Sequence, residues 1–148
     1  MRVLLRLVLA ALLLSGCATQ EMRQQRDDVL ARAAHPVLCQ KGDECEMKWS
    51  RVLQWLDAHS HWKLRNVTDA IVTTEGPLDT EYPAFSIQKV PKGDGRYEIL
   101  FKAWCAKGTS LAVALLGCEP DEWELMADFV EFVNQPIPQP TAARRNVP

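Results

Sequence analysis

The sequence has no excess of basic side chains and no apolar segment long enough to span a membrane. Its 17 Lys and Arg residues face 19 Asp and Glu residues, so the formal net charge is −2. Proteins that bind nucleic acid need clustered Lys and Arg to neutralise phosphates, and we therefore expect no nucleic-acid partner. A transmembrane helix needs about 20 apolar residues, whereas the apolar run over residues 7–14 stops at Ser15.

Catalytic motifs are also missing. The sequence contains neither a G-x-S-x-G nucleophile elbow nor a glycine-rich phosphate loop. His59 and His61 alternate and could share a metal ion, but no third ligand is evident, and a histidine near a helix C-terminus ordinarily complements the helix dipole. Four acids form a cluster: Glu119, Asp121, Glu122 and Glu124. Because acids are favoured at helix N-termini, we interpret this cluster as a helix start and not as a pair of catalytic carboxylates. With no catalytic motif and no third metal ligand, we expect no catalysis and no metal or other cofactor.

The N-terminus has the pattern of a signal peptide. Arg2 and Arg6 precede the apolar run, and small residues follow it. The junction Leu14-Ser15-Gly16-Cys17 resembles the lipobox of bacterial lipoprotein precursors. That resemblance implies a signal peptide over residues 1–16, cleavage between Gly16 and Cys17, a diacylglycerol on the Cys17 thiol, and an acyl chain such as palmitate on the freed amine. The alternative is an ordinary secretory signal followed by a chance cysteine.

Such a lipid would hold the chain on a membrane. Two or three acyl chains anchor firmly, because each buried methylene contributes about 0.8 kcal/mol. Residue 18 is Ala rather than Asp, which in Gram-negative lipoproteins favours the outer membrane, here its periplasmic face. The resemblance also implies contact with the lipoprotein-processing and sorting machinery. Loss of Arg2 and Arg6 with the signal changes the formal charge to about −4, so the lipid must provide the anchoring.

The cysteines other than Cys17 predict disulfides. They are Cys39, Cys45, Cys105 and Cys118. An exported chain meets an oxidising compartment, where an even number of cysteines normally pairs. Of the possible pairings, Cys39–Cys45 with Cys105–Cys118 is favoured because each pair brackets a short loop. A four-cysteine zinc site is the alternative, although neither spacing matches the usual knuckle.

The chain is long enough for one small domain after the signal. Residues 17–36 form a polar segment that we interpret as a lipidated N-terminus and tether, helical in part around residues 28–34. Residues 37–134 form the predicted domain, and residues 135–148 form a flexible tail in which proline recurs.

Periodicity predicts the elements of that domain. A helix is expected over residues 44–58, with an apolar stripe of Cys45, Trp49, Val52, Leu53 and Leu56. Trp55 lies off this stripe and is a candidate contact residue. Alternation predicts one long strand over residues 61–74, bent near residues 66–69, and two strands over 84–90 and 96–104, with a turn at 91–95.

A second helix is expected near residue 120, with Pro120 in its first turn. Its predicted buried stripe is Trp123, Met126, Ala127, Val130 and Val133, widened by Phe129 and Phe132. The order helix, three strands, helix predicts an α+β fold of two layers, in which a three-stranded antiparallel meander packs against helices and disulfides brace the domain.

These features predict a non-catalytic envelope module that binds an envelope protein. The expected contact surfaces are an exposed edge strand and the apolar segment over residues 111–116, with Leu111, Val113, Leu115 and Leu116. That segment could instead cover one end of the core. The alternative function is a periplasmic carrier of a lipid or another small apolar ligand, held between the sheet and the helices.

The domain is also similar to small proteobacterial lipoproteins of uncharacterised function. The similarity lies in the helix start Cys45-Glu46-Met47-Lys48-Trp49 and in the segment from Trp104-Cys105 to Cys118. This resemblance implies no particular activity.

Overall fold

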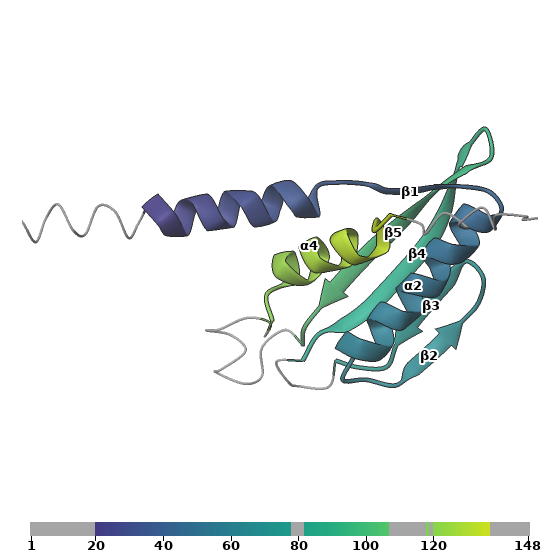
Figure 1. Cartoon of the computed structure of the whole chain (residues 1–148). Helices are drawn as coiled ribbons and strands as arrows, with labels where there is room; N and C mark the ends of the chain where they lie inside the picture. Colours follow the sequence, from purple (N-terminus) through teal and green to yellow (C-terminus); the bar gives the residue numbers. More distant parts are fainter. Residues whose placement is uncertain (1–19, 78–81, 107–117, 119, 137–148) are drawn as a thin grey trace, which may run out of the picture.

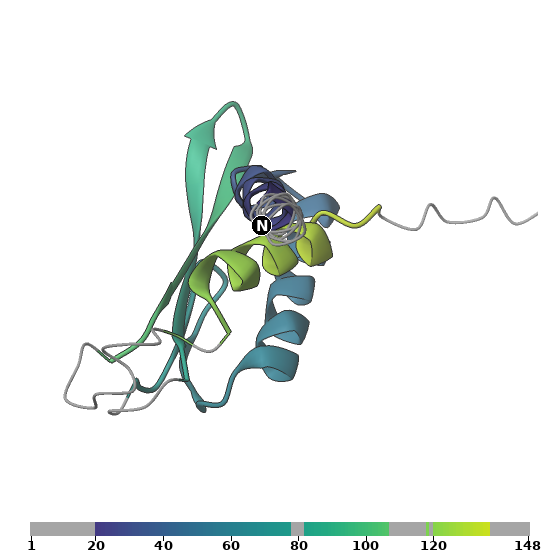
Figure 2. The ribbon, with the colours of Figure 1, turned by 90° about the vertical axis from the view of Figure 1, so that its left-hand side faces the viewer.

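A computed structural model describes residues 20–77, 82–106, 118 and 120–136. A helix over residues 20–33 comes first. It is followed by β1 (Val37–Gln40), α2 (Asp43–His59), β2 (Leu64–Val67), β3 (Ile71–Thr74), β4 (Ala84–Gly93), β5 (Arg96–Trp104) and α4 (Glu122–Val133). The strands form one antiparallel sheet in the order β1-β5-β4-β3-β2. Helices α2 and α4 lie on the same side of this sheet (Figures 1 and 2).

The α+β class and the disulfide bracing are confirmed, but the predicted number of strands is wrong, because the sheet has five strands and not three. The segment predicted as one long strand forms two, β2 and β3, joined by a turn at residues 68–70. The Thr68 hydroxyl oxygen accepts hydrogen bonds from the backbone N–H of Ala70 at 3.3 Å and of Ile71 at 3.0 Å. This side chain holds the backbone in a turn and therefore ends the strand.

The fifth strand is β1, which the sequence analysis placed at the domain start without assigning it to the sheet. It pairs with β5, and Val37 lies opposite Ile99. Val37 and Cys39 are buried while Leu38 and Gln40 are exposed, the alternation expected of a strand with one covered face.

The core lies between the sheet and the two helices. Helix α2 contributes Cys45, Trp49, Val52, Trp55 and Leu56. The buried residues of α4 are Leu125, Ala127, Phe129, Val130 and Val133. The prediction that Trp55 is a surface contact is therefore wrong, because its side chain is fully buried. The position flanks the α2 stripe, and α4 packs beside α2 and covers this flank.

Helix α4 begins at Glu122, slightly later than the predicted start near residue 120. Asp121 is its N-cap, and the Asp121 carboxylate accepts a hydrogen bond from the Trp123 backbone N–H at 2.8 Å. Pro120 therefore precedes the helix and does not belong to its first turn. Trp123, which was predicted in the buried stripe, is 49% exposed.

The helix over residues 20–33 extends well beyond the part of the polar segment that was predicted to be helical. Its C-terminal end is held to the domain, because Ala33 is buried and an Arg32 guanidinium nitrogen lies 3.2 Å from a Glu131 carboxylate oxygen on α4. This helix and α4 begin on the same side of the molecule (Figure 1). None of the helices in the described ranges is both long enough and apolar enough to span a membrane.

Candidate functional site

The four cysteines of the domain form the two local disulfides that the spacing favours. Cys39–Cys45 joins β1 to the first turn of α2, with a Cα–Cα distance of 5.0 Å. Cys105–Cys118 joins the residue after β5 to the segment that leads into α4, with a Cα–Cα distance of 5.7 Å. The first bridge is almost wholly buried, since Cys39 and Cys45 are only 3% and 4% exposed. Each bridge therefore fixes one end of the sheet to a neighbouring helix or helix start.

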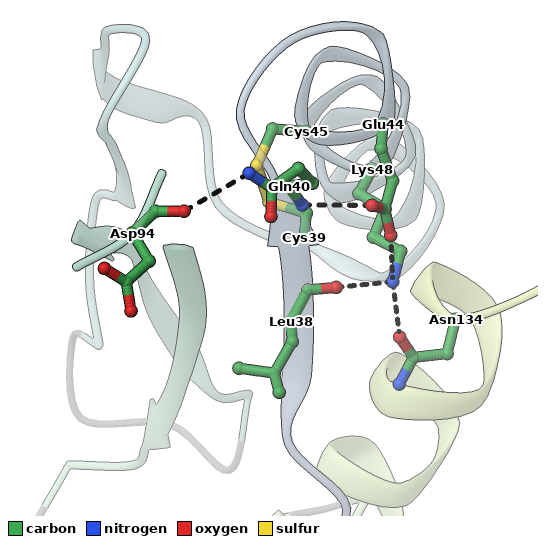
Figure 3. Close-up of a disulfide and its surroundings, with 8 residues drawn as sticks. All are labelled: Leu38, Cys39, Gln40, Glu44, Cys45, Lys48, Asp94 and Asn134. Atoms are coloured by element: carbon green, nitrogen blue, oxygen red, sulfur yellow. Dashed lines mark hydrogen bonds and ion pairs between the residues drawn. A yellow bond between two sulfur atoms is a disulfide. The ribbon is translucent and has the colours of Figure 1, made fainter. Parts of the chain in front are cut away.

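The outer edge of β1 is bonded to side chains of α2 (Figure 3). The Lys41 N–H donates to the Gly95 carbonyl. In an antiparallel pair this pattern alternates, so the backbone N–H and C=O groups of the odd-numbered residues of β1 face β5, and those of Leu38 and Gln40 face away from the sheet. The Lys48 ammonium donates to the Leu38 carbonyl at 2.6 Å, and the Gln40 N–H donates to a Glu44 carboxylate oxygen at 3.0 Å. We call this the capped edge.

The two capping side chains also bind each other, and one of them reaches α4. The Lys48 ammonium lies 3.4 Å from the second Glu44 oxygen, an i,i+4 pair on α2, and its side chain is only 11% exposed. It also donates to the Asn134 side-chain oxygen at 3.1 Å, at the end of α4 (Figure 3). Arg51, one turn further along α2, donates to the carbonyls of Val133 and Pro136. Arg51 thus binds the last carbonyl of α4 and one beyond it, and Lys48 binds the side chain of its C-cap residue, so the two cations hold β1, α2 and α4 together.

The opposite edge of the sheet is β2, and its four residues are all exposed. Leu64 and Val67 are 42% and 53% exposed. Within the described ranges, no side chain bonds to the backbone of β2, so we call it the open edge. The register with β3 shifts between Leu64 and Asn66. This bulge, and the charges of Lys63 and Arg65, restrict which strands can pair there.

The two histidines of the predicted metal alternative have different neighbours. The His59 ring stacks on Trp55 at 4.3 Å between centroids, and its Nε2 lies 3.2 Å from an Asp128 carboxylate oxygen on α4. The His61 ring stacks on Tyr82 at 4.2 Å. In the part of the chain that the structure describes, no group of three His, Cys, Asp or Glu residues is placed to hold a metal ion. His59 instead joins α2 to α4.

A groove of about 700 Å³ separates the helix over residues 20–33 from the first turn of α4. Met22 and Val29 line one wall, and Trp123 and Glu124 line the other. Met22 is 61% exposed and Trp123 is 49% exposed. Of the predicted acidic cluster, Asp121 caps α4 and also lines this groove, whereas Glu119 lies outside the described residues.

The residues predicted for lipidation and for the apolar contact segment also lie outside the described residues. They are Gly16, Cys17, Leu111, Val113, Leu115 and Leu116. The capping pair, Glu44 and Lys48, was not predicted. Their i,i+4 spacing is visible in the sequence, but it indicates only a helix-surface ion pair. Their contact with β1 depends on a strand that was not predicted.

Comparison with models of known protein families, with curated proteins and with solved structures found no match for this chain.

Proposed function

We propose that this chain is a bacterial lipoprotein, anchored through lipid on Cys17 at the periplasmic face of the outer membrane, where it acts as a non-catalytic module that binds an envelope protein. The lipobox-like junction Leu14-Ser15-Gly16-Cys17 supports the anchor. The two disulfides support export, because such bonds persist in oxidising compartments.

The difference between the two sheet edges is the observation that carries the binding role. An unpaired strand edge offers a row of N–H and C=O groups that can bond an extended segment of another protein. At the capped edge, Lys48 and Glu44 already bond the Leu38 carbonyl and the Gln40 N–H, two of the outward groups of this four-residue strand. At the open edge, β2 is exposed along its whole length. Strand addition is therefore directed to β2.

The chemistry of β2 indicates what kind of segment fits. Main-chain hydrogen bonds would supply affinity, and the exposed Leu64 and Val67 would supply apolar contact. Lys63 and Arg65 place positive charge at the start of the strand. Opposite charges directly across a strand pair are favourable and like charges are not. The partner segment should therefore be extended, with apolar side chains and at least one acid.

The alternative, a carrier for an apolar ligand, would need space between the sheet and the helices. Three fully buried aromatic side chains, Trp55, Phe85 and Phe129, fill this region. They favour protein binding over ligand storage. Native mass spectrometry of the soluble domain tests the alternative directly, because a carrier would retain a bound adduct.

The anchor is tested by metabolic labelling with a clickable fatty acid. Wild-type protein should incorporate the label and sediment with membranes, and Cys17→Ser should lose both, because the thiol is the expected attachment point for the diacylglycerol. Label that persists in Cys17→Ser, or its absence from wild type, would show that the anchor assignment is wrong. Density-gradient separation of the two membranes in the same cells tests the outer-membrane assignment.

The open edge is tested by photocrosslinking in intact cells. A photoreactive amino acid at Leu64 should capture an envelope protein, whereas the same amino acid at Leu38 on the capped edge should not. The two positions are matched in exposure, at 42% and 39%. Equal capture from both positions, or none from Leu64, would rule out strand addition at β2. A third probe at Val113 tests the other predicted contact segment.

A further inference from the structure

We infer that Met22 and Trp123 rest on the headgroup layer of the membrane that holds the Cys17 lipid, and that this contact fixes the orientation of the domain. We call these two residues the membrane-facing pair. The inference depends on the proposed anchor and adds to it the face that the domain turns toward the bilayer, together with the class of lipid that the face fits.

The proposed lipid and the helix are separated by a short distance along the chain. Only three residue steps separate Cys17 from Gln20, the first residue of this helix that the structure describes. A residue spans at most about 3.6 Å, so Gln20 lies within about 11 Å of the lipid-bearing cysteine. The helix over residues 20–33 is about 21 Å long at about 1.5 Å per residue. Its first turns are therefore the part of the described chain closest to the bilayer, and Met22 lies in the first of them.

That helix is attached to the domain at its C-terminal end. Ala33 is buried, and the Arg32–Glu131 ion pair of 3.2 Å joins the last turn of the helix to α4. The helix runs in the same direction as α4 and projects beyond the start of α4 (Figure 1), and the groove between them is lined by residues from Met22 to Arg32 of the helix. A helical connection fixed in this way limits the faces that the domain can present to the membrane, in contrast to a flexible tether.

The surface beside this helix exposes large apolar side chains. Met22 and Trp123 are among the large apolar side chains that remain exposed, and both line the groove between the helix and α4. Trp is enriched at the boundary between water and hydrocarbon, where its ring can be apolar on one side and hydrogen-bonded on the other. Contact with a headgroup layer would remove both side chains from bulk water.

The charge around the pair selects the lipid class. The helix carries three basic and three acidic residues: Arg23, Arg26, Arg32, Glu21, Asp27 and Asp28. The first turn of α4 adds further acids, including Glu124. This surface has no net positive charge to attract an anionic membrane. It fits a zwitterionic phospholipid, whose phosphate can meet the arginines and whose ammonium can meet the acids.

The test uses the lipidated full-length protein in vesicles of phosphatidylcholine and phosphatidylethanolamine with brominated acyl chains, which quench tryptophan at close range. Wild-type fluorescence should show a quenched component, and Trp123→Phe should lose it. Trp62→Phe is the matched control, because this partly buried indole donates to the Tyr82 carbonyl at 3.3 Å, away from the groove. It should retain the quenched component. Met22→Ser should weaken quenching without removing a fluorophore.

The outcomes separate the two proposals. Quenching that is unchanged in Trp123→Phe, in vesicles that still float with the protein, would overturn the docking inference and leave the anchor intact. Protein that does not float with the vesicles would overturn the anchor and the docking inference with it. Quenching that appears only with anionic phosphatidylglycerol, and that salt removes, would overturn the assignment to zwitterionic lipid.

Discussion

Replacing Trp55 with alanine is expected to lower the free energy of unfolding by about 3–5 kcal/mol, the range for removing a large aromatic side chain from a core. The indole is fully buried. Phe85, Phe101 and Phe129 each meet it edge-on, with ring centroids 5.4 Å away. Alanine would leave a cavity between three rings that come from two strands and from α4, and these elements cannot all move in to fill it.

The Trp55 indole N–H also donates to an Asp128 carboxylate oxygen at 2.6 Å, and Trp55→Phe separates this bond from the packing. Because the Asp128 side chain is 57% exposed, water can replace the lost donor, and Trp55→Phe should cost about 1 kcal/mol. Chemical denaturation followed by circular dichroism measures all variants. Trp123→Ala is the matched control on the other helix and should change stability by no more than about 0.5 kcal/mol. Equal losses for Trp55→Ala and Trp123→Ala would contradict the burial described here.

Removing the Cys39–Cys45 bridge with the double variant Cys39→Ala/Cys45→Ala is expected to lower the free energy of unfolding by about 2–4 kcal/mol. Closing even a short loop restricts the unfolded chain, and both cysteines are also buried in the core. Strand β1 has only four residues, Val37–Gln40, so it depends on this bridge more than the longer strands do. Thermal unfolding under oxidising conditions measures the loss.

Hydrogen exchange distinguishes a local effect from a general one. In Cys39→Ala/Cys45→Ala, the amides of β1 that face β5 should lose protection before those of β4. The double variant Cys105→Ala/Cys118→Ala is the control. Its larger loop predicts a loss of about 3 kcal/mol, but β1 should keep its protection relative to β4. The same exchange pattern in both variants would show that the first bridge has no special role at the β1 edge.

The longer elements could be predicted from the sequence because each repeats its pattern several times. Helix α2 shows a period of three and four through Cys45, Trp49, Val52 and Leu56, and the structure places it at Asp43–His59. The alternation in β4 and β5 is equally long, and a turn with two glycines separates them. A periodic pattern that repeats several times rarely arises by chance, so it predicts a helix or a strand reliably.

The shorter elements could not be predicted for the same reason. Strand β1 offers only one alternation, Val37 and Cys39, which is too little to distinguish a strand from a loop. The turn between β2 and β3 contains one turn-favouring residue, Asp69, but no glycine or proline, and it depends on the Thr68 hydroxyl. Neither feature leaves a periodic trace in the sequence.

Trp55 and Trp123 show the limit of helical periodicity, because the first was predicted to be exposed and is buried, and the second was predicted to be buried and is half exposed. Periodicity locates one stripe on a helix, but it does not say how wide the buried face is. Trp55 lies at the flank of the α2 stripe and is buried because α4 packs there. Trp123 lies in the first turn of α4, where the helix meets the groove. Both outcomes depend on how the two helices are arranged, which no single segment encodes.

The capped edge also determines how many partners the sheet can accept. A sheet with two free edges can recruit a strand on each side, and repeated recruitment produces a filament. Here Glu44 and Lys48 bond one N–H and one C=O of the β1 edge, so the proposed strand addition would be confined to β2. Under that proposal, each of many copies concentrated on a membrane should take one partner, and the assembly should stop there.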